Sequence, residues 1–170
     1  MILAKSVTKT YGDQVAVDEL DLDIPKGQFF GLLGPNGSGK TTIARLLSHA
    51  LMPISGEVKL TISDQNPSVA LVDQFPERML GISSLKTFLD QLIASGKMDA
   101  YHVATCINVL QSHHIPWESI QDKLPVELPW NILRLTMIIL LANCNYDVLI
   151  LDEPTFGLGT EQTRKMVDYF

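Results

Sequence analysis

Apolar and polar residues alternate in the first quarter of the chain, as they do in strands with one covered face. Leu20, Leu22 and Ile24 alternate with aspartates, and a turn opens directly afterwards at Pro25. This pattern predicts an antiparallel hairpin at the edge of a sheet. Residues 58–62 alternate again and predict another strand.

Short apolar segments predict further strands. Phe29–Leu33 is an unbroken apolar run, which is typical of a strand covered on both faces, and it leads directly into a glycine-rich loop. Val69–Val72 predicts a short strand that ends at Asp73-Gln74. Val148–Leu151 predicts a buried strand that ends in two carboxylates, Asp152 and Glu153.

Elsewhere the apolar residues repeat with the period of a helix. This period predicts helices over Thr41–Leu51, 85–96, 99–110, Pro129–Ala142 and a segment that starts near Thr160. Asp99 is a predicted helix cap, and Pro129 suits a first helical position. The glycine-rich loop therefore lies between a predicted strand and a predicted helix.

Composition narrows the class of protein. The chain carries 13 basic and 19 acidic residues, and its formal charge of -6 argues against nucleic acid as a partner. Cys106 and Cys144 lack the spacing of a metal site or a disulfide framework, so we interpret both as buried small hydrophobes in a reducing compartment. The most apolar stretch, residues 132–142, is interrupted by Arg134 and too short to span a bilayer, which predicts a soluble or peripheral protein.

The glycine-rich loop, GPNGSGKTT at residues 34–42, matches the pattern G-x-x-x-x-G-K-[ST]. Its glycines would let successive backbone N–H groups point at phosphate oxygens, and the following helix N-terminus would add its positive end. Lys40 would reach the β and γ phosphates, and the Thr41 hydroxyl would bind Mg²⁺. The alternative is a flexible glycine turn. The predicted nucleotide-binding residues of this loop are Asn36, Gly37, Ser38, Gly39, Lys40, Thr41 and Thr42.

The acidic pair after the last predicted strand is the second candidate feature. In an open α/β sheet, ligands bind at the carboxyl ends of the strands. Asp152 could hold the magnesium shell, and Glu153 could orient and deprotonate the water that attacks the γ-phosphate. The alternative is a solvated acidic turn.

These motifs and the residues around them resemble the ATPase subunit of an ABC (ATP-binding cassette) transporter. The resemblance is close over VTKTYGDQVAVDELDLDIPKGQFFGLLGPNGSGKTT, residues 7–42. It implies that Tyr11 stacks on adenine, the alternative being an ordinary sheet tyrosine. It also implies that Gln74, in VDQFPER, contacts Mg²⁺ and the attacking water; the alternative is a surface glutamine. Gln74, Glu153 and Lys40 would then be the catalytic residues.

The resemblance implies an α/β fold: a P-loop NTPase core of the ABC ATPase type with an antiparallel β edge and an inserted α-helical lobe. Residues 1–76 and 143–170 would form the catalytic core, and residues 77–142 the lobe. The implied function is an ATP-binding subunit that binds and hydrolyses ATP with Mg²⁺ to drive transport through a separate transmembrane subunit. It would lie in the cytoplasm, on the inner face of the cell membrane.

The sequence also departs from this family. Two cassettes of the family sandwich each ATP between one phosphate loop and the partner's LSGGQ signature, which is expected here at residues 128–132. Only Leu128 matches, and proline and tryptophan replace the residues whose hydroxyl and N–H groups would approach the γ-phosphate. Gly159, in PTFGLG, stands where the family has an aspartate that crosses the dimer interface.

These departures predict an asymmetric pair of cassettes with one competent and one impaired site, so a heterodimer is favoured over a homodimer. The family's switch histidine would follow Phe170, and the chain is therefore expected to lack the C-terminal part of its domain. Two other interpretations remain open: an ABC-type ATPase that does not act in transport, or a catalytically impaired nucleotide-binding module.

Overall fold

The computed structural model describes residues 1–62, 67–75 and 77–169. The chain forms two compact units, each described below by itself. The first consists of Met1–Leu71 and Asp147–Asp152, and the second of Val72–Tyr146 and Glu153–Phe170. The division into a core of 1–76 and 143–170 and a lobe of 77–142 stays a prediction.

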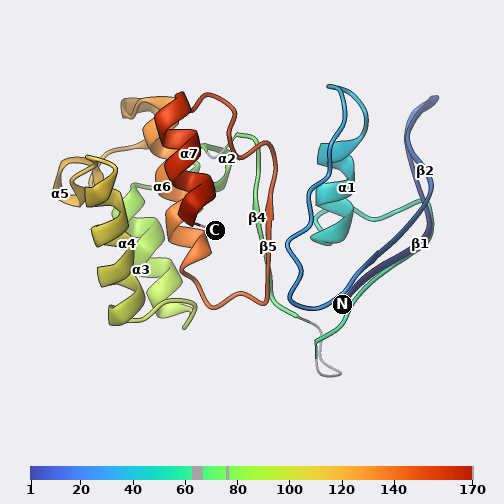
Figure 1. The fold of residues 1–170 in the computed structure, drawn as a ribbon, viewed down its shortest axis with the longest axis horizontal. Coiled ribbons are helices and arrows are strands. Elements are labelled where there is room, and N and C mark those ends of the chain that lie inside the picture. Colours follow the sequence, from blue (N-terminus) through green and yellow to red (C-terminus); the bar gives the residue numbers. More distant parts are fainter. Residues whose placement is uncertain (63–66, 76, 170) are drawn as a thin grey trace. The chain divides into compact units, whose positions relative to one another are not determined.

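An antiparallel sheet organises the first unit. Its strands are β1 (Ile2–Tyr11), β2 (Gln14–Ile24) and β3 (Ser55–Leu60), in the order β2-β1-β3. Figure 1 shows β1 and β2 side by side in this unit. Tyr11 faces Gln14 across a two-residue turn, where Gly12 has a φ of 57° that suits this tight connection. The predicted hairpin is thus confirmed, with Ile24 buried and its neighbouring aspartates exposed.

The core of this unit joins the sheet to one helix. Ala4, Val7 and Val17 from the sheet pack with Ile43, Leu46 and Leu47 of α1 (Lys40–Leu47). The predicted extension of this helix to Leu51 is wrong. The chain turns at His49, whose φ of 57° is left-handed, and the Leu51 N–H returns to the Arg45 carbonyl.

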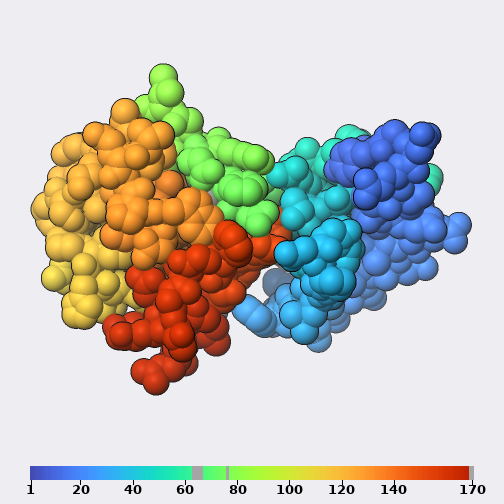
Figure 2. Space-filling view, turned by 90° about the horizontal axis from the view of Figure 1, so that it is seen from above, coloured from blue at the N-terminus to red at the C-terminus, as the bar shows by residue number. Residues whose placement is uncertain are grey.

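The predicted strand at residues 29–33 is also wrong. This segment has no regular secondary structure, and Phe29 and Leu33 are 86% and 94% exposed. Residues 29–33 are exposed and belong to the light-blue part of the chain in Figure 2. An apolar run becomes a buried strand only where neighbouring strands complete its backbone hydrogen bonds, and neither described sheet includes it.

The other two apolar runs do form strands. β4 (Val69–Val72) and β5 (Val148–Leu151) are neighbours in a two-stranded sheet. All four residues of β5 are half-buried, so the prediction of a strand is confirmed but that of full burial is not.

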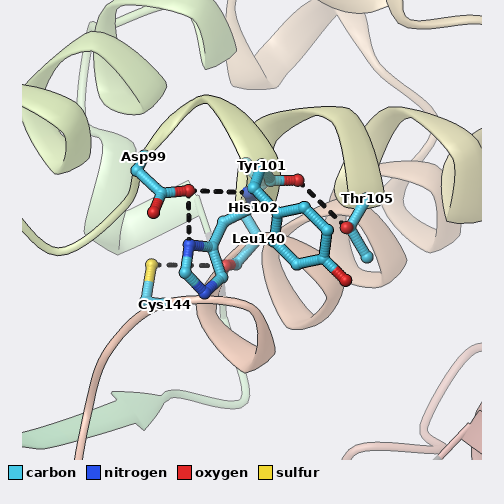
Figure 3. A network of polar contacts seen from close by, with 6 residues as sticks. All are labelled: Asp99, Tyr101, His102, Thr105, Leu140 and Cys144. Carbon is cyan, nitrogen blue, oxygen red and sulfur yellow. Dashed lines mark hydrogen bonds and ion pairs between the residues drawn. The ribbon is translucent and has the colours of Figure 1, made fainter.

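The second unit is helical (Figure 1). Its elements are α2 (Glu77–Leu80), α3 (Leu85–Ala94), α4 (Ala100–Ser112), α5 (Trp117–Ile120), the 3₁₀ helix η1 (Pro125–Glu127), α6 (Trp130–Ala142) and α7 (Thr160–Tyr169). The predicted cap of α4 is confirmed, because Asp99 Oδ1 accepts the His102 N–H at 3.0 Å and lies 2.7 Å from His102 Nδ1 (Figure 3).

The centre of the second unit is α6, in which Leu133 to Leu141 are all buried. Pro129 precedes this helix as its N-cap, so the helix starts one residue later than predicted. Cys106 of α4 is buried against the Ile139 carbonyl, whereas Cys144 is half-buried. None of the helices in the described part of the chain combines the length and apolar character that crossing a lipid bilayer requires.

We expect both thiols to react slowly with iodoacetamide in the folded protein. Burial raises the pKa of Cys106 to about 12 and that of Cys144 to about 11, so almost no reactive thiolate exists at pH 8. Mass spectrometry after timed alkylation, with and without urea, measures this protection. Rapid labelling of Cys106 without denaturant would contradict the packing of α4 on α6.

Candidate functional site

The loop between residues 34 and 39 depends on glycine at defined positions. Gly37 and Gly39 have φ values of 81° and 89°, which are left-handed and favour glycine. A Cβ atom on Gly39 would lie 2.4 Å from the Ala16 carbonyl oxygen, and one on Gly34 would lie 2.6 Å from Ser38 Oγ. Gly39 therefore cannot carry a side chain unless the Ala16 backbone moves, and the left-handed conformations of Gly37 and Gly39 favour glycine at both positions.

The end of this loop is the N-terminus of α1, with Gly39 as the cap and Lys40 as the first helical residue. No acidic side chain lies in the first turn, so no carboxylate of the helix offsets its positive end. Asn36, Gly37 and Ser38 are exposed, Thr41 is half-buried and Thr42 is buried. The Ser38 N–H donates to the Pro35 carbonyl within the loop at 3.2 Å. A helix N-terminus without a nearby carboxylate of its own would suit a bound anion.

The Lys40 side chain folds back over the loop. Its Nζ donates to the carbonyl oxygens of Gly34 and Pro35, at 2.7 and 2.8 Å. These neutral acceptors hold the ammonium above the loop, where an anionic phosphate oxygen would form a stronger, charge-assisted hydrogen bond. Lys40 is thus placed where a phosphate group bound by the loop would meet it.

The acidic pair lies at the end of β5. Asp152 is 5% exposed and belongs to the first unit, with the loop, whereas Glu153 belongs to the second. Glu153 is half-buried and has a φ of 48°. Gln74 Nε2 donates to Glu153 Oε2 at 2.8 Å, so the structure brings these two candidate residues together.

One residue of this site was missed by sequence reasoning. Arg134 of α6 is completely buried and donates to the backbone carbonyls of Gln74, Glu153 and Pro154. The signal was available, since Arg134 is the one charged residue within an apolar helix. In the sequence alone, this arginine indicates only that the segment does not span a membrane.

Tyr11, the predicted adenine partner, ends β1 and is 50% exposed. Lys9 Nζ lies 5.8 Å from the centre of its ring. An exposed ring at the end of a strand can accept a stacked base, and the role of Tyr11 stays a prediction.

The segment expected to carry the signature leads into α6. Pro129 caps the helix without a side-chain hydrogen bond, and the Trp130 ring meets the Phe156 ring edge to face at 5.4 Å. A Cβ atom on Gly157 would lie 2.2 Å from Trp130 Cζ3. Trp130 therefore packs within its own unit, against the turn that follows Glu153.

Magnesium would depend on oxygen donors from several segments. In the part of the chain that the structure describes, no three His, Cys, Asp or Glu side chains group into a metal site. The predicted ligands Thr41, Gln74 and Asp152 offer hydroxyl, amide and carboxylate oxygens, which are the donors that Mg²⁺ prefers. The donor chemistry fits an ion held jointly by protein and phosphate oxygens.

Comparison with known proteins gives consistent matches. The family model described as ABC transporter matches residues 17–156. The chain is 37% identical over 175 residues to the Nod factor export ATP-binding protein I of Cupriavidus metallidurans, covering 96% of this chain and 55% of that protein. It is 30% identical to the energy-dependent translational throttle protein EttA of Escherichia coli, covering 95% of this chain and 28% of that protein.

A solved structure supports the same fold. The dimeric post-hydrolysis state of the ATP-binding cassette MJ0796 bound to ADP and Pi superposes with a TM-score of 0.77 at 23% identity. The match covers 99% of this chain and 80% of that one. The predicted fold class, a P-loop ATPase cassette with α and β elements, is confirmed. The chain spans about half the length of the first of these relatives and less of the second.

We expect Gly157→Ala to lower the free energy of unfolding by about 1–3 kcal/mol, because the added methyl group overlaps the Trp130 ring and φ is 75°. Gly159→Ala is the matched control, since nothing lies within 4 Å of its Cβ position. Urea denaturation measures both. Equal losses for the two variants would contradict the observed packing of Trp130.

Proposed function

Because the chain belongs to the ABC transporter family, we propose that it is an ATP-binding subunit that binds and hydrolyses MgATP to drive transport through a separate membrane subunit. Members of this family are ATP-hydrolysing enzymes. The observation that carries the proposal is the loop before α1, where Lys40 lies over a turn of left-handed glycines. The protein would work on the inner face of the cell membrane.

In this proposal, the backbone N–H groups from Gly37 to Thr42 bind the phosphates. Lys40 exchanges its two carbonyl partners for β and γ phosphate oxygens, and so neutralises charge that develops during transfer. Mg²⁺, when bound by Thr41 and Asp152, would supply further neutralisation of the phosphate oxygens. Tyr11 stacks on the adenine ring.

Glu153 acts as the base for the attacking water. Its carboxylate accepts a hydrogen bond from Gln74 Nε2, which fixes one oxygen and leaves the other for the water. Transfer of the γ-phosphoryl group to this water gives ADP and phosphate, while the water proton moves to the Glu153 carboxylate.

A second cassette would complete the site. The MJ0796 cassette is described as dimeric and bound to ADP and Pi, which supports a paired arrangement. In such a pair, as the family resemblance implies, the partner's signature would lie over the nucleotide. In this chain the signature position holds Pro129, which has no N–H, and Trp130, whose ring packs on Phe156. A partner with an intact LSGGQ would therefore complete this chain's site, whereas the reverse site would be impaired, which favours a heterodimer.

Two other functions have specific support. The match to the translational throttle protein EttA supports an ABC-type ATPase that acts outside transport. The altered signature supports a nucleotide-binding module that does not hydrolyse ATP. Copurification with a membrane protein would favour transport over an ATPase that acts outside transport. Single-turnover hydrolysis of ATP in a mixture with a partner cassette would exclude a module that only binds nucleotide.

We expect Lys40→Ala to weaken MgATP binding by about 10- to 100-fold, because it removes charged hydrogen bonds to the phosphates. Isothermal titration calorimetry measures the affinity. Lys26→Ala, at an exposed turn, is the control and should bind as the unmodified chain does. Equal affinities for the two variants would exclude the loop as the phosphate site.

We expect Glu153→Gln to retain MgATP binding but lower turnover by about 100- to 10,000-fold in a mixture with a cassette that has an intact LSGGQ. The amide keeps the shape of the side chain and cannot take a proton. Phosphate release measures turnover, and Glu118→Gln, an exposed change in α5, is the control. An unaffected rate would discard Glu153 as the base and the asymmetric pairing with it.

A further inference from the structure

Arg134 lies between the two segments that carry the proposed water-activating residues. Its side chain is 0% exposed, and it projects from α6, whose neighbouring residues Leu133 and Leu135 are buried apolar side chains. Burying a guanidinium is costly unless its N–H groups are satisfied. The hydrogen-bond partners of the Arg134 guanidinium therefore indicate the role of this side chain.

Three of these contacts are to backbone carbonyls. Arg134 Nη1 donates to the Gln74 oxygen at 2.6 Å, Nη2 donates to the Glu153 oxygen, and Nε donates to the Pro154 oxygen at 3.4 Å. A planar guanidinium directs these donors in fixed directions, which an ammonium group cannot do. One side chain thus joins the segment at Gln74 to the segment at Glu153, residues 79 positions apart in the chain.

The Glu153 backbone needs such support. Its φ of 48° lies in the left-handed region, where residues with side chains are disfavoured and are held by their surroundings. The Arg134 hydrogen bond to the Glu153 carbonyl holds this conformation directly. The same side chain holds the Gln74 backbone, so the Gln74 amide and the Glu153 carboxylate meet at 2.8 Å.

The guanidinium is itself fixed by Trp130. The two residues are four positions apart on α6 and so share one face of the helix, with the guanidinium carbon 5.0 Å from the ring centre. The Trp130 ring also packs edge to face against the Phe156 ring and lies beside Gly157. Trp130, which replaces a signature residue, therefore anchors the arginine that supports Glu153.

We propose that Arg134 is a positioning residue for ATP hydrolysis, which holds the Gln74 amide against the Glu153 carboxylate through their backbone carbonyls, with Trp130 fixing its guanidinium. The proposal rests on the proposed function for its kinetic consequence. The contact between Gln74 and Glu153 can be measured without nucleotide, so the geometric part is tested separately.

The geometric test uses nuclear magnetic resonance of protein with ¹⁵N-labelled glutamine side chains. The Gln74 side-chain signals are identified by their loss in Gln74→Ala, and Glu153→Ala shows their position when the contact is absent. We expect Arg134→Lys to move them toward that position. Arg78→Lys is the matched control, because Arg78 also stacks on an aromatic ring, that of Phe75, but is exposed.

A second variant covers the case in which Arg134→Lys does not fold. Trp130→Leu keeps Arg134 but removes the ring beside it, and should move the Gln74 signals in the same direction by a smaller amount. Gln74 signals that stay at their original position in a folded variant of either kind would overturn the proposal.

The kinetic test uses the mixture with a cassette that has an intact LSGGQ. We expect Arg134→Lys to lower kcat by about 100-fold, the effect of a misplacement of the order of 1 Å, with MgATP affinity and KM unchanged. Loss of affinity in parallel with kcat, or full activity, would overturn the positioning role. Failure of the unmodified chain to bind MgATP would instead refute the proposed function, and the resonance test would still decide the contact.

Discussion

The close approach of Gly39 to the Ala16 carbonyl is the constraint on which the candidate site depends. There is no room for a Cβ atom at this position, and the left-handed φ of Gly39 turns the chain from the loop into α1. Because α1 packs on the sheet through Ile43, Leu46 and Leu47, the hydrophobic core sets the position of the helix N-terminus. The packing of α1 and the proposed anion binding thus rest on the same short segment.

In the second unit, the guanidinium of Arg134 is buried in an apolar helix and its N–H groups need hydrogen-bond acceptors. The Trp130 ring covers one side of the guanidinium, and backbone carbonyls accept its N–H groups. A glycine at position 130 would leave the arginine without this stacking partner. The tryptophan at the expected signature position is therefore part of the internal packing of this chain.

Local patterns predicted most of the elements correctly. The hairpin follows from alternation, the strands at Val69–Val72 and Val148–Leu151 from short apolar runs, and the helix cap at Asp99 from a hydrogen bond within a few residues. The prediction of a strand at residues 29–33 was wrong, because an apolar run carries no information about which strands lie beside it. Local patterns also placed the end of α1 too late, since the turn at His49 has no signal in side-chain polarity.

The sequence alone determined where the glycine-rich loop and the acidic pair lie, because both are contiguous motifs defined by residue type and spacing. Only the tertiary structure decided that Gln74 meets Glu153, and that Arg134 and Trp130 support this pair from α6. These residues come from segments far apart in the chain. Their contacts follow from how helices and turns pack, which no periodicity within a single segment encodes.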